Sequence, residues 1–297
     1  MPKKVISVLI CFVSFFAAAQ EDEALYSRLQ ALKNSDITYY NVDGIIITSQ
    51  ATALPFNDKN LKKVFKQYDI TQDDLKALDP NHPLKDFCIT KNEDILSGLT
   101  LYTSFYFIED TAKNIVVVWF GAVGKHDAAF EKHFIKLIVN NKIPKSCYAS
   151  PDANIINFGG REILLEDSCY WTNINTVQCP YMGEMNWSVH KDAEDAKKSV
   201  ENQLAMTKSK KEGKIISEET VDILFENIPT KATKIVYDFT GIKSVLASTS
   251  GGKTLTVYYV SQKVRNNYMS CVLSYWNNDD IEFNGLPFLL DQVMQLK

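Results

Sequence analysis

The segment Thr254–Trp276 constrains the fold more than any other stretch of the chain. Its sequence, TLTVYYVSQKVRNNYMSCVLSYW, alternates apolar and polar residues on both sides of a polar turn at residues 262–267. This pattern is typical of a β-hairpin with one buried face. A helix is expected directly afterwards, because apolar residues then recur at i, i+3, i+4 and i+7: Leu286, Leu289, Leu290 and Val293.

A similar hairpin and helix occur in the first part of the chain. Residues 101–108 and 115–123 are rich in aromatic and β-branched residues, and an amphipathic helix capped near Asp127 follows them. Both hairpins open with Gly-x-Thr-Leu, at residues 98–101 and 252–255, and both second arms end at an aromatic pair. A strand and a helix precede each hairpin, so the order strand, helix, hairpin, helix occurs twice, about 150 residues apart. An internal duplication explains this order, and convergence on a common plan is the alternative.

The predicted fold class is α+β, built from two similar halves. Many short strands and four or five packing helices favour antiparallel sheets, and we expect the helices of each half to pack on one face of its sheet. A polar segment with a proline, residues 146–152, separates the halves. We therefore expect a first α+β domain at residues 20–148 and a second at residues 149–297.

Residues 1–19 are expected to form a cleaved signal peptide. Lys3 and Lys4 precede an apolar run at residues 5–19, which ends in three alanines. The run has 15 residues, whereas a membrane-spanning helix needs roughly 20, so we favour cleavage over a membrane anchor. We therefore predict an exported protein, in the periplasm, at the cell surface or outside the cell, with no membrane span after cleavage.

The net charge argues against one class of partner. The formal charge is −4, and loss of Lys3 and Lys4 leaves 30 Lys and Arg against 36 Asp and Glu, which gives −6. Nucleic-acid-binding proteins need a basic face, so we predict no nucleic-acid partner.

Export makes the cysteines informative, because disulfides form in oxidising compartments. Cys169 and Cys179 flank a polar turn, and we predict a disulfide between them. Cys88 and Cys147 both lie in polar connections and are the candidates for a second pair. Cys271 lies on the apolar face of the hairpin at residues 254–276, so we expect a buried free thiol there.

No stretch of the sequence points to a particular reaction. Cys169 and His190 could form a thiol–imidazole pair, but the expected disulfide would remove the nucleophile. The chain has no Gly-x-Ser-x-Gly motif, and His126 and His133 are too far apart on one helix to share a zinc ion. The oxygen-rich loop at residues 277–282 lacks the pattern of a calcium-binding EF-hand. We therefore predict no catalytic residues, no metal and no cofactor.

Aromatic residues are the remaining candidates for a binding surface. Alternation places some aromatic residues of each hairpin on the face opposite the core, where they either meet a second layer or form a recognition surface. The candidate binding residues are Trp119, Tyr258, Tyr268 and Trp276. Packing in a core or between domains is the alternative fate for such residues.

Two classes of function fit these observations. The first is an exported, non-catalytic module of the cell envelope that binds a protein or small-molecule partner, with a toxin-neutralising protein as a variant. The second is an exported hydrolase whose catalytic residues are dispersed along the sequence. The absence of a recognisable catalytic motif favours the first class.

Overall fold

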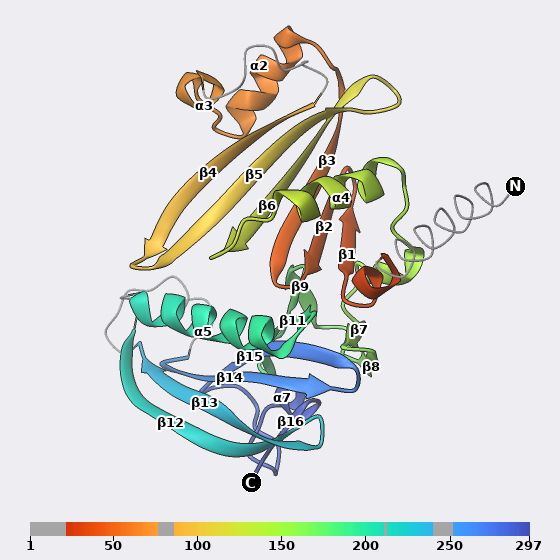
Figure 1. The fold of residues 1–297 in the computed structure, drawn as a ribbon. Coiled ribbons are helices and arrows are strands. Elements are labelled where there is room, and N and C mark those ends of the chain that lie inside the picture. Colours follow the sequence, from red (N-terminus) through yellow and green to blue (C-terminus); the bar gives the residue numbers. More distant parts are fainter. Residues whose placement is uncertain (1–21, 77–85, 211–212, 240–251) are drawn as a thin grey trace, which may run out of the picture.

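The computed structural model describes residues 22–76, 86–210, 213–239 and 252–297. The expected signal peptide at residues 1–19 lies outside this part of the chain, and so does a strand expected at residues 242–247. The described chain forms two large antiparallel sheets, one above the other in Figure 1, and a small two-stranded sheet. The α+β class with antiparallel sheets is therefore confirmed.

The first sheet contains six strands in the order β1-β2-β3-β6-β5-β4. Their bounds are β1 Gln30–Asn34, β2 Ile37–Val42, β3 Ile45–Pro55, β4 Asp86–Leu96, β5 Leu99–Glu109 and β6 Asn114–Val123. Asp43 and Gly44 connect β2 to β3 with φ angles of 52° and 76°, which is the tight turn that an Asp-Gly pair between two strands indicates. Residues 21–33 carry leucines at helical spacing, Leu25, Leu29 and Leu32, yet only residues 22–26 are helical. Residues 30–34 pair instead with β2, and this pairing outweighs the local helical pattern.

Helices cover both faces of the first sheet. They are α2 Asp58–Gln67, α3 Gln72–Lys76 and α4 Ala128–Val139. Leu61 and Val64 of α2 pack in one apolar cluster with Val117, whereas Phe134 of α4 packs in another with Val118. The expectation of helices on one face is therefore wrong. The physical reason lies in β6, where Ile115–Phe120 is apolar without interruption, so both faces of the strand need a cover.

The second sheet contains eight strands in the order β16-β12-β13-β14-β15-β11-β10-β9. Their bounds are β9 Tyr170–Asn173, β10 Thr176–Cys179, β11 Gly183–His190, β12 Lys214–Phe225, β13 Ile228–Asp238, β14 Thr254–Val264, β15 Asn267–Trp276 and β16 Met294–Leu296. The hairpin expected at residues 254–276 is β14–β15. Its residues Met269, Cys271 and Leu273 are fully buried, as the alternation predicts.

Two helices cover opposite faces of the second sheet as well. They are α5 Ala193–Ser209 and α7 Phe288–Asp291. Val200 of α5 packs in a cluster with Tyr259, while Leu289 of α7 packs in the main core with Leu273. The helix α7 is shorter than the expected helix, yet the whole stripe Leu286, Leu289, Leu290 and Val293 is buried.

The two hairpins differ in the position of their aromatic pairs. The shared Gly-x-Thr-Leu segment equates Leu101 with Leu255. Leu101 pairs with Val123, whereas Leu255 pairs with Trp276. Trp276 therefore corresponds in register to Val123 and not to Phe120, so the aromatic pairs are not equivalent positions.

A small hairpin, β7 Ile155–Phe158 and β8 Arg161–Leu164, is attached to the second sheet by an ion-pair network. The carboxylate of Glu226 accepts hydrogen bonds from Arg161 Nη2 and Arg265 Nη1, each at 2.6 Å. Arg265 Nε also donates to the carbonyl oxygen of Gly159 at 2.8 Å. Because Glu226 is shared by two guanidinium groups, it connects β8 to the turns at the end of the second sheet.

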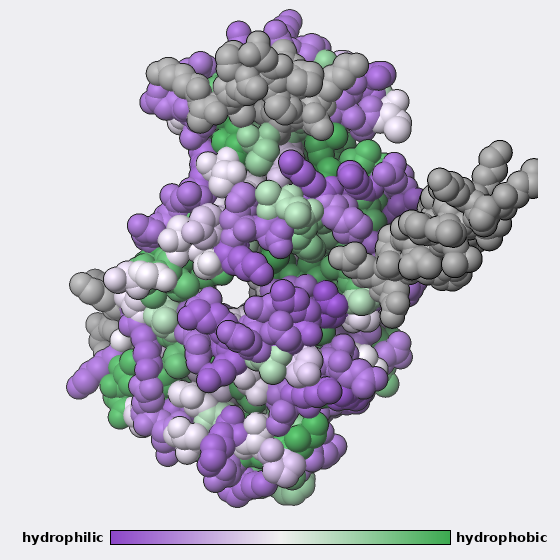
Figure 2. Space-filling view, in the orientation of Figure 1, coloured by the Kyte–Doolittle hydropathy of each residue, from purple (hydrophilic) through white to green (hydrophobic). Residues whose placement is uncertain are grey.

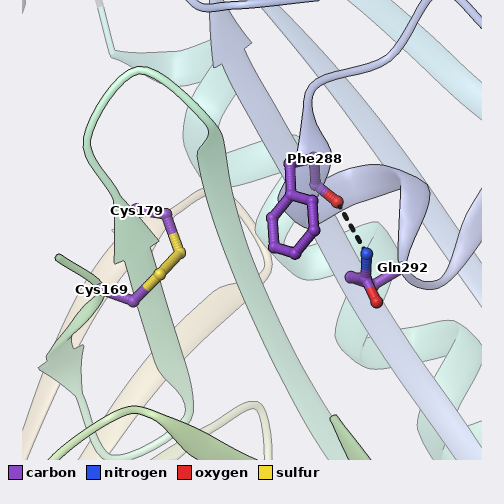
Figure 3. The surroundings of a disulfide bond; sticks show 4 residues. All are labelled: Cys169, Cys179, Phe288 and Gln292. Carbon is purple, nitrogen blue, oxygen red and sulfur yellow. Dashed lines mark hydrogen bonds between the residues drawn. A yellow bond between two sulfur atoms is a disulfide. The ribbon is translucent and has the colours of Figure 1, made fainter. Parts of the chain in front are cut away.

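The predicted disulfide between Cys169 and Cys179 is present, with the two Cα atoms 4.2 Å apart. It belongs to the main core of the second sheet, and Figure 3 shows it near Phe288, whose carbonyl oxygen accepts a hydrogen bond from Gln292. Cys271 is a buried free thiol, as expected. No membrane-spanning helix is found in the described parts of the chain, where no helix is both long and apolar enough to cross a bilayer.

The second disulfide, between Cys88 and Cys147, is absent, and both cysteines are free thiols. Cys88 lies on β4, at one edge of the first sheet. Cys147 directly precedes Tyr148, which bridges to β1 at the other edge. Five strand spacings of roughly 4.8 Å separate these edges by about 24 Å, far more than the Cβ separation of about 4 Å in a disulfide.

Candidate functional site

A cleft with a volume of about 980 Å³ lies between the two sheets. Figure 2 shows an opening near the middle of the molecule, between the ends of β5 and β6 and the helix α5. The residues around the cleft come from the β2–β3 turn, the end of β6, the start of α4, the end of β9, the β9–β10 turn, β11 and α5. This volume lies in the upper part of the usual range for small-molecule sites, and junctions of this kind are common places for them.

Helix α5 presents a polar stripe to the cleft. Asp192 caps its first turn by accepting a hydrogen bond from the backbone N–H of Asp195 at 2.8 Å. Ala196 and Val200 lie on one side of the helix and are buried against the second sheet. The residues that line the cleft follow at helical spacing on another side: Asp195, Lys198, Ser199, Asn202, Gln203 and Met206.

Strand β11 adds polar side chains by alternation. Met185 and Trp187 point into the main core, whereas Asn186, Ser188 and His190 line the cleft. Ser188 Oγ accepts a hydrogen bond from Asn175 Nδ2 at 3.1 Å, so the β9–β10 turn and β11 present a connected polar surface.

The wall from the first sheet is mainly apolar. It includes Ile46, Leu101 and Val123, with Gly121 between them. The backbone N–H of Asp43, in the β2–β3 turn, donates to the carbonyl oxygen of Val189 at 3.1 Å. This hydrogen bond joins the two sheets at one end of the cleft.

His190 is the most deeply buried titratable group of the cleft, with 2% of its surface exposed. Its Nε2 lies 2.8 Å from Ser270 Oγ, and its Nδ1 has no hydrogen-bond partner. Burial lowers the pKa of His190 below its ordinary value, although the nearby carboxylate of Asp43 acts in the opposite direction. The ring is therefore neutral at pH 7. We assign its proton to Nε2, which donates to Ser270, because this leaves Nδ1 as an acceptor instead of an unpaired buried donor.

The edge of the His190 ring that carries Nδ1 faces the β2–β3 turn. A Cβ atom placed on Gly44 would lie 3.0 Å from Cε1 of His190, 3.8 Å from its Nδ1 and 3.6 Å from Ser199 Oγ. Gly44 and Ser199 both line the cleft.

Asn202 is a largely buried amide of the lining. It is 8% exposed and lines the cleft from α5. Within the described residues its amide makes no hydrogen bond, whereas the neighbouring Gln203 contacts Ser199 Oγ. Because its amide still reaches solvent, Asn202 is open to a hydrogen bond with water or with a molecule in the cleft.

Most of the charges around the cleft are paired. Arg28 holds Asp43 with two hydrogen bonds of 2.8 and 3.1 Å. Lys191 lies 3.4 Å from Asp195, whose carboxylate raises the pKa of this lysine. Lys125, Lys198 and Asp127 make no ion pair among the described residues, so two positive charges and one negative charge remain in the lining.

A second polar cluster lies in the first sheet near the start of α4. His126 Nε2 is 3.3 Å from Ser104 Oγ and 3.2 Å from Glu131 Oε2, and the hydroxyl of Tyr106 donates to the same oxygen at 2.8 Å. In a Ser-His-acid triad, the serine and the acid contact different nitrogens of the ring. Here both contact Nε2, so the ring cannot relay a proton between them.

No metal site is evident in the described residues, which contain no group of three or more His, Cys, Asp and Glu side chains suited to an ion. Asp43 and Asp195 are held in ion pairs, and the other histidine of the lining, His133, lies 2.7 Å from Asp22.

The four aromatic residues predicted to bind a partner do not form one surface. Tyr258 is 1% exposed and belongs to the main core, while Trp276 packs against Phe239 on the opposite face of the second sheet. Trp119 packs against Tyr68 on the first sheet. Tyr268 is half-buried, and Lys263 Nζ lies 5.3 Å from the centre of its ring. The expectation of a shared exposed face is therefore wrong, because helices cover both faces of each sheet.

The residues of the cleft were not recognised from the sequence. His190 was considered only as a partner of Cys169, which is in fact disulfide-bonded. One signal was available: the polar members of β11 alternate as Glu184, Asn186, Ser188 and His190. Four polar residues on one face of a strand beside a core strand indicate a polar junction or a site.

Comparisons with known proteins give no family. No family model matches the chain, and no match is found among curated proteins. Two solved structures are weakly similar. The di-domain ARO/CYC StfQ from the steffimycin biosynthetic pathway has a TM-score of 0.16 at 7% identity, over 83% of this chain and 72% of its own. The di-domain ARO/CYC BexL from the BE-7585A biosynthetic pathway has a TM-score of 0.15 at 9% identity, over 86% of this chain and 76% of its own. Likeness at this level carries no argument about fold or activity.

Proposed function

We propose that the protein is an exported, non-catalytic binding protein whose ligand occupies the cleft between the two sheets. The observation that carries this proposal is the cleft of about 980 Å³, whose lining contains a buried nitrogen without a partner, His190 Nδ1, and a largely buried amide, Asn202. Buried polar groups without partners are rare in folded proteins and are expected where a ligand completes the hydrogen bonds.

Binding fits the polar groups of the chain better than hydrolysis does. Ser270 is fully buried behind His190, so its hydroxyl has no route to a substrate. Ser104 is also fully buried, and it shares Nε2 of His126 with Glu131. A nucleophile needs both access and a base that can take its proton, and neither serine has both.

Export is supported by two independent features. Residues 1–19 have the charge and apolar pattern of a signal peptide, and the disulfide between Cys169 and Cys179 suits an oxidising compartment. Expression of the whole chain with intact-mass measurement tests this proposal. We expect the mature protein to begin at Gln20 and to occur outside the cytoplasm, and a cytoplasmic chain that keeps residues 1–19 would refute it.

We also infer that the two halves, residues 20–148 and 149–297, are domains that arose by duplication. In each large sheet the strand before the first long connecting helix pairs with the last strand of the hairpin: β3 with β6, and β11 with β15. A sequence profile of related chains is the test. The profile should align residues 98–123 with residues 252–276, so that Val123 and Trp276 occupy the same column. Absence of this alignment would favour convergence.

Blocking the cleft tests the binding function. Ser199 lies on the polar stripe of α5, so Ser199→Trp should fill part of the cleft. Glu201→Trp is the matched control, because Glu201 is exposed elsewhere on α5. In a small-molecule screen by thermal shift, we expect hits for the wild type and for Glu201→Trp that disappear in Ser199→Trp. Hits that survive in Ser199→Trp would place the binding site elsewhere.

A further inference from the structure

The chemistry of the cleft identifies the class of molecule that fits it, and this inference rests on the proposed binding function. Uncharged groups make up about half of the polar lining. Five amide side chains and two serines line the cleft: Asn173, Asn175, Asn186, Asn202, Gln203, Ser188 and Ser199. Each amide offers both donors and acceptors, so it matches a ligand group that also does both. A hydroxyl group is such a group, whereas an ammonium group only donates and a carboxylate only accepts.

Charged ligands fit the two unpartnered groups poorly. A carboxylate at the His190 end would face the lone pair of Nδ1, because the ring is neutral and its proton is on Nε2. An ammonium group would need a free carboxylate, but Asp43 and Asp195 are already paired with Arg28 and Lys191. The third carboxylate of the lining, Asp127, already accepts two backbone hydrogen bonds at the start of α4. A hydroxyl group can donate to Nδ1 of His190 without a change of charge, and another can both donate to and accept from the amide of Asn202.

The apolar wall matches the rest of such a molecule. Ile46, Leu101 and Val123 lie across the cleft from α5 and can cover the C–H face of a ring. We propose that the cleft binds a polyhydroxylated small molecule, a sugar of one or two rings, with hydroxyl groups hydrogen-bonded to His190 Nδ1 and to the amide of Asn202. Gly44 lies over the Nδ1 edge of His190, so a small movement of the β2–β3 turn opens this atom to the ligand.

Two substitutions at position 190 separate the two nitrogens of the ring. Glutamine can keep a polar atom near the position of Nε2 and its contact with Ser270, but it removes the acceptor at Nδ1. Asparagine can keep a polar atom near the position of Nδ1. We expect His190→Gln to weaken sugar binding about fivefold to tenfold, the effect of one hydrogen bond, and His190→Asn to weaken it less.

At position 202, leucine has nearly the same shape as asparagine but no polar atoms. We expect Asn202→Leu to weaken sugar binding by the same factor of about five to ten, because one hydrogen-bonded amide is lost. Glu201→Leu is the control on the same helix, since Glu201 is exposed and does not line the cleft. It should bind like the wild type.

The experiment uses the mature protein and a fixed set of probes. The sugars are galactose, maltose and glucuronate, and the other classes are represented by succinate, spermidine and decanoate. Binding is measured by calorimetry, and the side-chain signals of His190 and Asn202 are followed by ¹⁵N NMR. We expect at least one sugar to move both signals, and His190→Gln and Asn202→Leu to weaken its binding.

Two results would overturn the inference, and they can be told apart. If succinate, spermidine or decanoate moves these signals and no sugar does, the cleft binds ligands but is not a sugar site, so the proposed function stands. If no probe of any class moves them, both the sugar inference and the binding function of the cleft fail.

Discussion

At His190, burial and hydrogen bonding act on the same ring. Nε2 is held by Ser270, while burial disfavours the charged imidazolium and lowers the pKa. In the unfolded chain the ring is free to take up a proton near its ordinary pKa of about 6.5. The unfolded state therefore binds more protons than the folded state as the pH falls, and the contribution of His190 to stability depends on pH.

The first prediction concerns this pH dependence. The stability that His190 contributes is complete above about pH 6.5 and is lost as the pH falls towards its lower folded pKa. Between pH 7.5 and 5.5, the free energy of unfolding of the wild type should fall by up to about 1.4 kcal/mol more than that of His190→Gln. This is the value for one proton taken up by the unfolded chain over one pH unit. Urea unfolding of both proteins at the two pH values measures this difference. Equal losses would show that burial of His190 does not affect its protonation.

The second prediction concerns Gly183, at the start of β11. Its φ angle is +99°, and a Cβ atom there would lie 2.6 Å from Leu290 Cδ1 and 3.1 Å from the carbonyl oxygen of Ser274. Gly183→Ala should therefore lower the free energy of unfolding by about 2–4 kcal/mol, from backbone strain and overpacking together.

Gly98→Ala is the control for Gly183→Ala. Gly98 has a φ angle of +81°, but a Cβ atom there would meet nothing within 4 Å. This variant should show the backbone cost alone, about 1 kcal/mol. If both variants lose the same stability in denaturant unfolding, the contact with α7 contributes nothing.

At the scale of single elements, the sequence pattern was a good guide wherever one period dominated. The alternation in Thr254–Trp276 located both arms of the hairpin. It failed where a tertiary contact decided the outcome. Gln30–Asn34 left the helical pattern to pair with β2, and the helix near Leu289 shortened to one turn while its apolar side chains stayed buried.

The cleft itself could not be predicted in the same way. Its apolar wall, which includes Val123, and its polar stripe, which includes Asn202, belong to different sheets. Periodicity shows which side of an element is polar, but it does not show which other element that side will face. The polar side of α5 was therefore indistinguishable in sequence from an ordinary solvated helix face.

The third prediction concerns the start of α5, which carries the polar stripe. Asp192→Ala removes the side-chain acceptor for the N–H of Asp195 and should cost about 1 kcal/mol of stability. Asp192→Asn keeps a capping oxygen and should stay within a few tenths of a kcal/mol of the wild type. Hydrogen exchange should show faster opening of the first turn of α5 in Asp192→Ala alone. Equal protection in the two variants would contradict a capping function for Asp192.

At the scale of the whole molecule, the apolar cores of the two sheets are separate. The clusters built around Phe120 and Val117 contain only residues of the first sheet and its helices, and those around Leu273 and Tyr259 contain only residues from 153 onwards. The contacts that join the sheets are polar, such as the hydrogen bonds from Asp43 N to Val189 O and from Gln30 Nε2 to Ile174 O. Little apolar burial therefore couples the unfolding of one sheet to that of the other.

The last prediction follows from this separation: calorimetric unfolding should show two transitions, one for each sheet. Replacing Cys169 and Cys179 by alanine removes the disulfide in the second core and should lower one transition, with a loss of about 2–3 kcal/mol. Phe134→Ala removes a fully buried ring from the first core and should lower the other transition by about 3–5 kcal/mol. If both variants shift a single common transition, the polar junction couples the sheets as strongly as a shared core would. If each variant shifts its own transition, a ligand in the cleft should raise both, because it contacts both sheets and binds only when both are folded.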